Sequence, residues 1–142
     1  MTADPLVARI SRRIPPRQCD AQGMLHASRP AEHFEDALLA WLDAACGGYG
    51  ALRDAGVDLV MVASSIQYLA PARLDDEVGV DVVASGRGRS SLQLSFAMTR
   101  QGDVLVTATH TYVVVGASGS EPIPAVLERG LDGVGPIDRA RS

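Results

Sequence analysis

The chain contains few of the residues that mark disulfide-rich or membrane-spanning proteins. Cys19 and Cys46 are its only cysteines, too few for a disulfide scaffold or a structural zinc site, which favours free thiols in a reducing compartment. Residues 1–16 lack the uninterrupted apolar core of a signal peptide, and no later run approaches the roughly 20 apolar residues of a membrane span. We therefore expect a soluble, cytoplasmic protein that has no association with a membrane.

Aromatic residues and excess positive charge are also scarce. Phe, Trp and Tyr make up 4% of the chain, which leaves few platforms for stacking single-stranded nucleic acid. The net charge of -4 argues against a nucleic-acid-binding surface as well. At 142 residues, of which 46% are hydrophobic, the chain has the size and composition of a single domain spanning 1–142, with a partly irregular tail at 117–142.

One long amphipathic helix is predicted close after the first cysteine. Its apolar residues recur at helical spacing and form one stripe wide enough to face a sheet: Phe34, Ala37, Leu38, Trp41, Leu42 and Ala45. We expect Ser28 to cap this helix and Pro30 to occupy its first turn. Gly47 and Gly48 are expected to end it after Cys46.

Most of the remaining chain alternates between apolar and polar residues as strands do. Five strands are predicted, separated by Pro, Gly and Asp turns: residues 6–14, 57–69, 78–84, 92–99 and 104–115. The last three form an antiparallel meander, and short helical segments are expected at 49–55 and 125–131. The fold class is therefore α+β, with about five antiparallel strands and one long helix lying across them.

Three short motifs are spread over nearly the whole chain. The first places Asp20, Gly23 and the run His33-Phe34-Glu35-Asp36-Ala37 at fixed distances; the second is IQYLAPARLDDEV at 66–78, and the third is EPIP at 121–124. Together they resemble the 4-hydroxybenzoyl-CoA thioesterase family of the hotdog fold, whose opening motif is DxDxxGHVNNxxYLxYFEEAR. The chain departs from that motif at Gln18, where the first acid would stand, at residues 24–27 in place of HVNN, and at Pro30 in place of Tyr.

Asp20 is the main catalytic candidate. A lone Asp before a glycine is usually a turn former, but the family spacing implies a catalytic role. A carboxylate can attack a thioester carbonyl or activate water. Backbone N–H groups at the start of the helix, at Ala27 and Ser28, would then polarise the thioester oxygen.

Several other residues are weaker candidates. His26 is either a loop histidine or a second catalytic group beside Asp20, and Glu35 is either a surface charge or an alternative acid. Arg87 and Arg89 lie in a glycine-flanked turn, which in the resembling family meets the phosphates of coenzyme A. Polar residues in the second half of strand 57–69, namely Ser64, Ser65 and Gln67, are candidates for binding substrate or a partner subunit. No metal-ligand spacing is present, and His33, His110 and Cys19 are interpreted as structural.

The resemblance implies an acyl thioesterase that acts on acyl-CoA or on an acyl carrier protein, with Asp20 as nucleophile or general base. No cofactor is expected apart from the coenzyme A or phosphopantetheine of the substrate. The alternatives are a non-catalytic module that binds an acyl chain or pantetheine, and a hydratase or dehydratase of the same fold, which fits less well because their histidine segment is missing. Strand 57–69 is apolar on both faces in its first half, which predicts a homodimer or homotetramer joined there, with a shared site.

Overall fold

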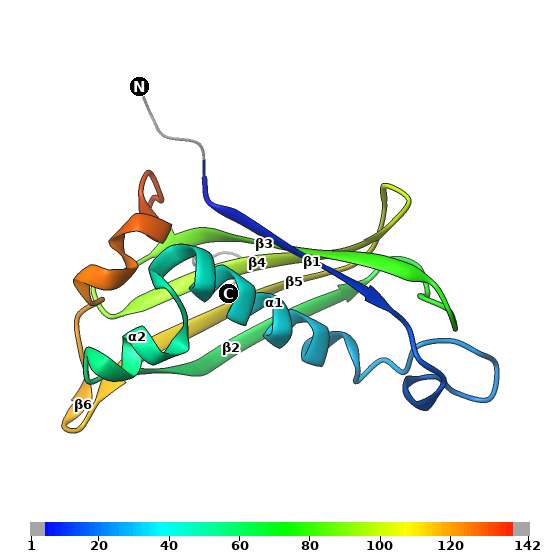
Figure 1. Ribbon diagram of the computed structural model, residues 1–142, viewed down its shortest axis with the longest axis horizontal. Helices are drawn as coiled ribbons and strands as arrows, with labels where there is room; N and C mark the ends of the chain where they lie inside the picture. The colour runs from blue at the N-terminus through cyan, green and yellow to red at the C-terminus, as the bar shows by residue number, and fades with distance from the viewer. Residues whose placement is uncertain (1–4, 138–142) are drawn as a thin grey trace.

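One long helix lies across a curled antiparallel sheet in the computed structural model, which describes residues 5–137 (Figure 1). The strands are β1 (Val7–Arg13), β2 (Asp58–Tyr68), β3 (Glu77–Arg87), β4 (Ser91–Arg100), β5 (Asp103–Gly116) and the short β6 (Gly119–Ser120). The sheet order is β1-β3-β4-β5-β2, with β6 paired to β5. All the pairings are antiparallel, which confirms the predicted α+β class and the meander of β3, β4 and β5.

The helices are α1 (Pro30–Cys46), α2 (Tyr49–Asp54) and the two 3-10 helices η1 (Pro16–Gln18) and η2 (Ala125–Leu131). None of them, within the part of the chain that the structure describes, is long and apolar enough to cross a membrane. The predicted segment at 125–131 is helical but of the 3-10 type. The two-residue strand β6 and the turn η1 were not predicted, because such short elements leave no periodic pattern in a sequence.

The start of α1 differs from the prediction at one residue. Arg29, not Ser28, is the N-cap residue, and no side chain caps the helix. Pro30 is its first residue, where the missing N–H costs nothing and the fixed φ suits a helix. At the other end Gly47 adopts φ 87°, and its N–H bonds to Asp43 O at 3.1 Å, which is the left-handed termination expected of a glycine.

The core lies between α1 and the concave face of the sheet. The helix buries the predicted apolar stripe, with Phe34, Trp41 and Leu42 fully enclosed. Alternate residues of the central strands meet that stripe because side chains along a strand point to opposite faces: Val78, Val80 and Val82 on β3, Leu92, Leu94, Phe96 and Met98 on β4, and Ala108, Tyr112 and Val114 on β5. Because the chain has few aromatic residues, most of the core consists of close-packed aliphatic side chains.

The segment η2 closes the core at the end of α1 that is remote from Asp20 (Figure 1). Leu127 and Leu131 of η2 are buried. Gly130 sits so close to α1 that an added Cβ would lie 2.7 Å from Ala45 Cβ and 2.8 Å from Trp41 Cζ2. Only a residue without a side chain fits at this contact.

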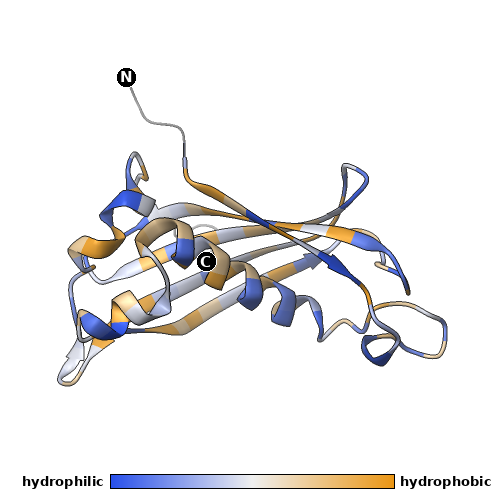
Figure 2. Cartoon of the chain, in the orientation of Figure 1, coloured by the Kyte–Doolittle hydropathy of each residue, from blue (hydrophilic) through white to orange (hydrophobic). Residues whose placement is uncertain are grey.

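The edge strand β2 exposes its apolar first half. Val60, Met61 and Val62 are 47%, 46% and 58% exposed, and Figure 2 colours this half of β2 toward the hydrophobic end of the scale. One side of β2 pairs with β5, and its other side is a free edge of the sheet in the described residues. An apolar, unpaired edge is a surface that proteins usually cover.

His110 is a buried polar group inside the core. It is 1% exposed, its ring lies 5.0 Å from the Phe96 ring and 6.2 Å from the Phe34 ring, and its Nδ1 lies 3.2 Å from the Tyr112 hydroxyl. Its Nε2 has no partner among the described residues. Burial holds the pKa of His110 below its usual range, so the imidazole is neutral in the folded protein.

This burial makes the stability of the fold depend on pH. The pKa of His110 is lower in the folded protein than in the unfolded chain. Above the unfolded pKa the ring is neutral in both states and costs no stability. As the pH falls below the unfolded pKa, His110 is protonated in the unfolded chain first, and the free energy of unfolding decreases. His110→Phe should therefore reduce the loss of unfolding free energy between about pH 7.5 and about pH 5.5, by at most about 1.4 kcal/mol for each pH unit. Urea unfolding at the two pH values measures this. Tyr112→Phe is the matched control, because it removes the same contact but keeps the titrating ring; an unchanged slope in His110→Phe would contradict the prediction.

Candidate active site

Asp20 lies at the start of a tight turn that returns the chain to a short bridge between Cys19 and Leu25. Its backbone N–H bonds to Met24 O at 2.8 Å, and its carbonyl accepts the Gly23 N–H at 3.0 Å. Gly23 adopts φ 77°, a conformation that glycine takes without strain. The family glycine is therefore present because the turn requires a left-handed residue.

The Asp20 carboxylate helps to build this turn. Its Oδ1 accepts the N–H groups of Gln22 at 2.9 Å and of Met24 at 3.0 Å. These bonds lower the pKa of Asp20, the Met24 bond most strongly, with a smaller contribution from the charge of His26. No donor among the described residues bonds to Oδ2, which leaves that oxygen for a substrate or a water molecule. Asp20 is thus both a turn former and an ionised carboxylate with one free oxygen.

Gln18 anchors the turn to α1 and to the loop that precedes it. Its side-chain oxygen lies 2.8 Å from His33 Nε2, and its backbone carbonyl accepts the His26 N–H at 2.9 Å. His33 is 4% exposed, and burial lowers its pKa, so a neutral imidazole donates Nε2–H to the amide oxygen. The neutral Gln18 fits this neutral partner, which gives a physical reason for its presence where the resembling family has an acid.

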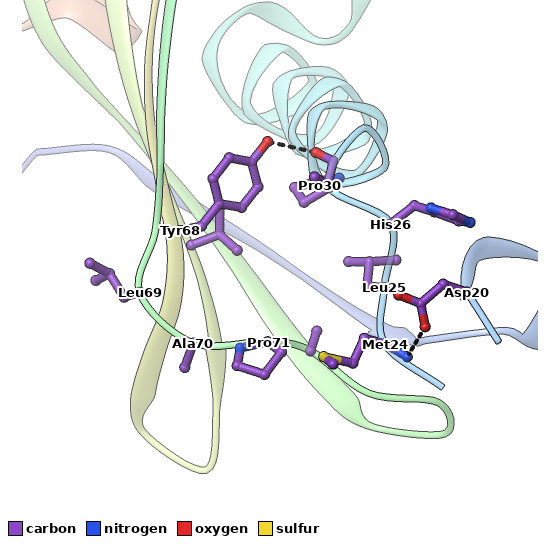
Figure 3. Close-up of a pocket in the computed structure, with 12 residues that line it drawn as sticks. Asp20, Met24, Leu25, His26, Pro30, Tyr68, Leu69, Ala70 and Pro71 are labelled. Carbon is purple, nitrogen blue, oxygen red and sulfur yellow. Dashed lines mark hydrogen bonds between the residues drawn. The ribbon is translucent and has the colours of Figure 1, made fainter. Parts of the chain in front are cut away.

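A cavity of about 450 Å³ opens beside Asp20. Figure 3 shows Asp20, Met24 and Leu25 on one side, and Tyr68, Leu69, Ala70 and Pro71 on the other. Pro30, Ala72 and Val106 complete a largely apolar lining. The segment Leu69–Ala72 had been predicted only as part of a family motif, and the structure shows that it forms one wall. Tyr68 stands in the same motif and in the polar second half of the predicted strand, but nothing in the sequence singles it out as a site residue.

The backbone N–H groups before α1 are not equivalent. The Arg29 N–H bonds to His26 O at 3.0 Å, and Pro30 has no N–H. The Tyr68 hydroxyl donates to Ala27 O at 2.6 Å. Carbonyl and N–H of one trans peptide point in opposite directions, so the Ser28 N–H points away from Tyr68. Among residues 5–137 neither the Ala27 N–H nor the Ser28 N–H has a hydrogen-bond acceptor. Ala27 lines the cavity and Ser28 does not, which favours Ala27 of the two predicted oxyanion donors.

The weaker catalytic candidates lie less favourably. His26 lines the cavity, but its ring points away from Tyr68 and Pro71 in Figure 3. Glu35 is exposed on α1 and does not line this cavity. Both remain untested as predictions, and the geometry favours Asp20 over Glu35 as the acid nearest to the apolar space.

The three polar residues of β2 do not share one face. Ser64 pairs with His110 and points to the face that α1 covers, whereas Ser65 and Gln67 pair with Thr109 and Thr107 on the opposite face. Ser65 and Gln67 line a separate depression of about 610 Å³. The three side chains therefore cannot contact one ligand within a single subunit, and Ser64 alone is on the face of the sheet that also carries Tyr68.

The two turn arginines differ as well. Arg87 donates to both carboxylate oxygens of Glu128, at 2.7 and 2.9 Å, and this pair raises the pKa of Arg87 and lowers that of Glu128. Arg87 thus ties the turn to η2. Arg89 is exposed and makes no side-chain hydrogen bond to the described residues, so of the two it is the one free to meet a phosphate.

No group of three or more His, Cys, Asp or Glu side chains within residues 5–137 is arranged to hold a metal ion.

The chain belongs to the thioesterase-like superfamily, whose family model matches residues 14–131. A provisionally named esterase of Aquifex aeolicus is 27% identical over 100 residues, covering 70% of this chain and 77% of the relative. A hypothetical protein of Aquifex aeolicus with a solved structure is 26% identical, with a TM-score of 0.79 over 88% of this chain and 98% of that one. A thioesterase from Thermus thermophilus, solved with coenzyme A and zinc, is 24% identical with a TM-score of 0.77, covering 87% of this chain and 91% of that one. These likenesses confirm the hotdog fold.

The two hydrogen bonds of the Asp20 carboxylate predict how Asp20 variants affect thermal stability. Asp20→Ala removes an acceptor from two backbone N–H groups, whereas Asp20→Asn keeps an oxygen that can accept both. Asp20→Ala should therefore lower the thermal midpoint more than Asp20→Asn does. Differential scanning calorimetry measures both. Equal midpoints in the two variants would show that the turn holds without these bonds.

Proposed function

We propose that the protein is an acyl-CoA thioesterase in which Asp20 is the nucleophile or the general base. The observation that carries the proposal is an ionised Asp20 with one oxygen unbonded within residues 5–137, at the edge of an apolar cavity that Ala27 also lines. The superfamily, and the thioesterase from Thermus thermophilus solved with coenzyme A, support the same substrate class.

The geometry supports two routes to one set of products. In the first, Asp20 Oδ2 attacks the thioester carbon, the C–S bond breaks and the thiolate of coenzyme A leaves; water then hydrolyses the mixed anhydride. In the second, Asp20 takes a proton from water, the resulting hydroxide attacks, and the proton goes to the leaving thiolate. Both give a free acid and a thiol. The Ala27 N–H stabilises the negative oxygen in either route.

A binding module without catalysis is the alternative, since one fold serves many functions. The apolar lining of the cavity would hold an acyl chain or pantetheine whether or not Asp20 reacts. Delivery by an acyl carrier protein is also compatible with an open site. The activity of an Asp20 variant separates catalysis from binding.

Asp20→Asn should lower kcat by about a hundredfold or more, because it removes the negative charge that attacks or accepts a proton. The Asn side chain keeps an oxygen that can accept the two backbone N–H groups of the turn. The variant should therefore fold, and a loss of activity would reflect the lost charge. Release of free thiol from a panel of acyl-CoAs, with the native protein and the variant, measures this. Asp54→Asn is the matched control, since Asp54 is exposed at the end of α2 and remote from the cavity. Native turnover in Asp20→Asn would remove Asp20 from the mechanism, and binding without turnover by the native protein would favour the binding module.

We also propose that the active unit is at least a dimer, joined through the free edge of β2. Antiparallel self-pairing about a two-fold axis would cover Val60 and Met61 and extend the sheet. It would also place the start of one β2 beside the end of its partner. The β3–β4 turn lies level with the start of β2, because Ser91, just after the turn, pairs with Val113, which pairs with Val60. The Asp20 cavity adjoins Tyr68 at the other end of β2. One subunit's Arg89 would therefore approach the other subunit's Asp20.

A mixing experiment tests the shared site. Arg89→Ala should raise KM for acyl-CoA more than it lowers kcat, and less so at high salt, because a phosphate contact is lost. When Asp20→Asn and Arg89→Ala subunits are mixed and allowed to exchange, the mixed dimer regains one complete site, with native Asp20 from one chain and native Arg89 from the other. Thiol release at low acyl-CoA should then exceed the sum of the two variants. Activity that only adds up, or an active monomer by light scattering, would contradict the shared site.

A further inference from the structure

Tyr68 makes a contact that the reaction scheme above has not used. It is the last residue of β2, pairs with Val106 on the face that α1 covers, and lines the cavity. The residue is 54% exposed, yet its hydroxyl is fixed at 2.6 Å from Ala27 O, 41 residues away along the chain. Figure 3 shows the ring reaching from the strand across to the segment that leads into α1.

An exposed tyrosine needs no such partner for stability, because water can satisfy its hydroxyl. The bond instead fixes the orientation of a peptide group. With Ala27 O held by Tyr68 and His26 O held by the Arg29 N–H at 3.0 Å, the two peptides on either side of the Ala27 Cα are both held. The N–H between these two anchored carbonyls is that of Ala27.

No side chain caps the backbone N–H groups at the start of α1. The N-cap residue Arg29 makes no side-chain capping bond, and Pro30 follows it. Without a cap, the segment His26–Arg29 depends on contacts from elsewhere in the fold. Of the side chains that line the cavity, Tyr68 is the one that donates to this segment.

We propose that Tyr68 is a positioning residue: by holding Ala27 O, its hydroxyl fixes the backbone of Ala27, so that the N–H of this residue, which belongs to the preceding peptide, is presented to the thioester oxygen. The proposal rests on the proposed thioesterase function and adds a residue to it. The tyrosine does not touch the reacting atoms and does not exchange a proton with them. Its effect is on the transition state, where the oxygen becomes negative and a correctly oriented donor matters most.

Tyr68→Phe tests this with little change of shape, since it keeps the ring that walls the cavity and removes only the hydroxyl. We expect kcat to fall by about tenfold or more, because Ala27 is then held at only one of its two peptides and its N–H is less well oriented toward the oxygen, while KM changes by less than about twofold. The plot of kcat against pH should keep its shape and fall uniformly. The thermal midpoint should fall little.

Tyr49→Phe is the matched control, because Tyr49 lies on α2, where its ring faces Arg53 rather than the cavity. Native kcat in Tyr68→Phe, or a rise in KM with kcat unchanged, would overturn the proposal, the latter in favour of a direct contact with substrate. Loss of one limb of the pH profile would also overturn it, since the hydroxyl would then be transferring a proton. If the native protein releases no thiol from any acyl-CoA, the proposed function fails; if it does and Tyr68→Phe matches it, only the role of Tyr68 fails.

Discussion

The burial of the α1 stripe in the concave face of the sheet is the constraint on which the other features depend. Phe34 and Trp41 are fully enclosed, and each such side chain favours the folded state by about 1.5–3 kcal/mol through removal of apolar surface from water. Because the stripe fixes how the helix is rotated, it also fixes where the helix begins relative to the strands. The position of the Asp20 turn follows from that placement, since Pro30 comes only ten positions after Asp20 in the sequence.

Two independent hydrogen bonds then hold the chain on either side of the Asp20 turn. His33, on the first turns of α1, holds Gln18 on one side, and Tyr68, at the end of the edge strand, holds Ala27 on the other. The site is thus held between the helix and the sheet, and neither element alone would set the geometry. Because of these contacts, a carboxylate and a backbone N–H donor that lie on a loop are both held in fixed positions.

The fold was largely predictable because its signals are periodic. The alternation in β3 and β4 and the apolar stripe of α1 each extend over many residues. A single residue that breaks the pattern therefore does not change which type of element is predicted. The single contacts that shape the site have no period. Nothing in the sequence indicates that Arg87 pairs with Glu128, or that the pairing of β2 with β5 shifts register between Met61 and Ala63. Asp20 was found only because family spacing singles it out from other turn-forming acids.

The close fit of Gly130 against Trp41 affects how the chain folds during its synthesis. The helix and every long strand precede η2 in the sequence, and Leu127, Gly130 and Leu131 of η2 pack against the far end of the core. During synthesis, the indole of Trp41 therefore stays uncovered until residue 131 has left the ribosome. Until then the nascent chain carries an apolar opening, which is the kind of surface that chaperones bind. A larger residue at position 130 would prolong that state in the finished protein, because η2 could no longer close onto α1.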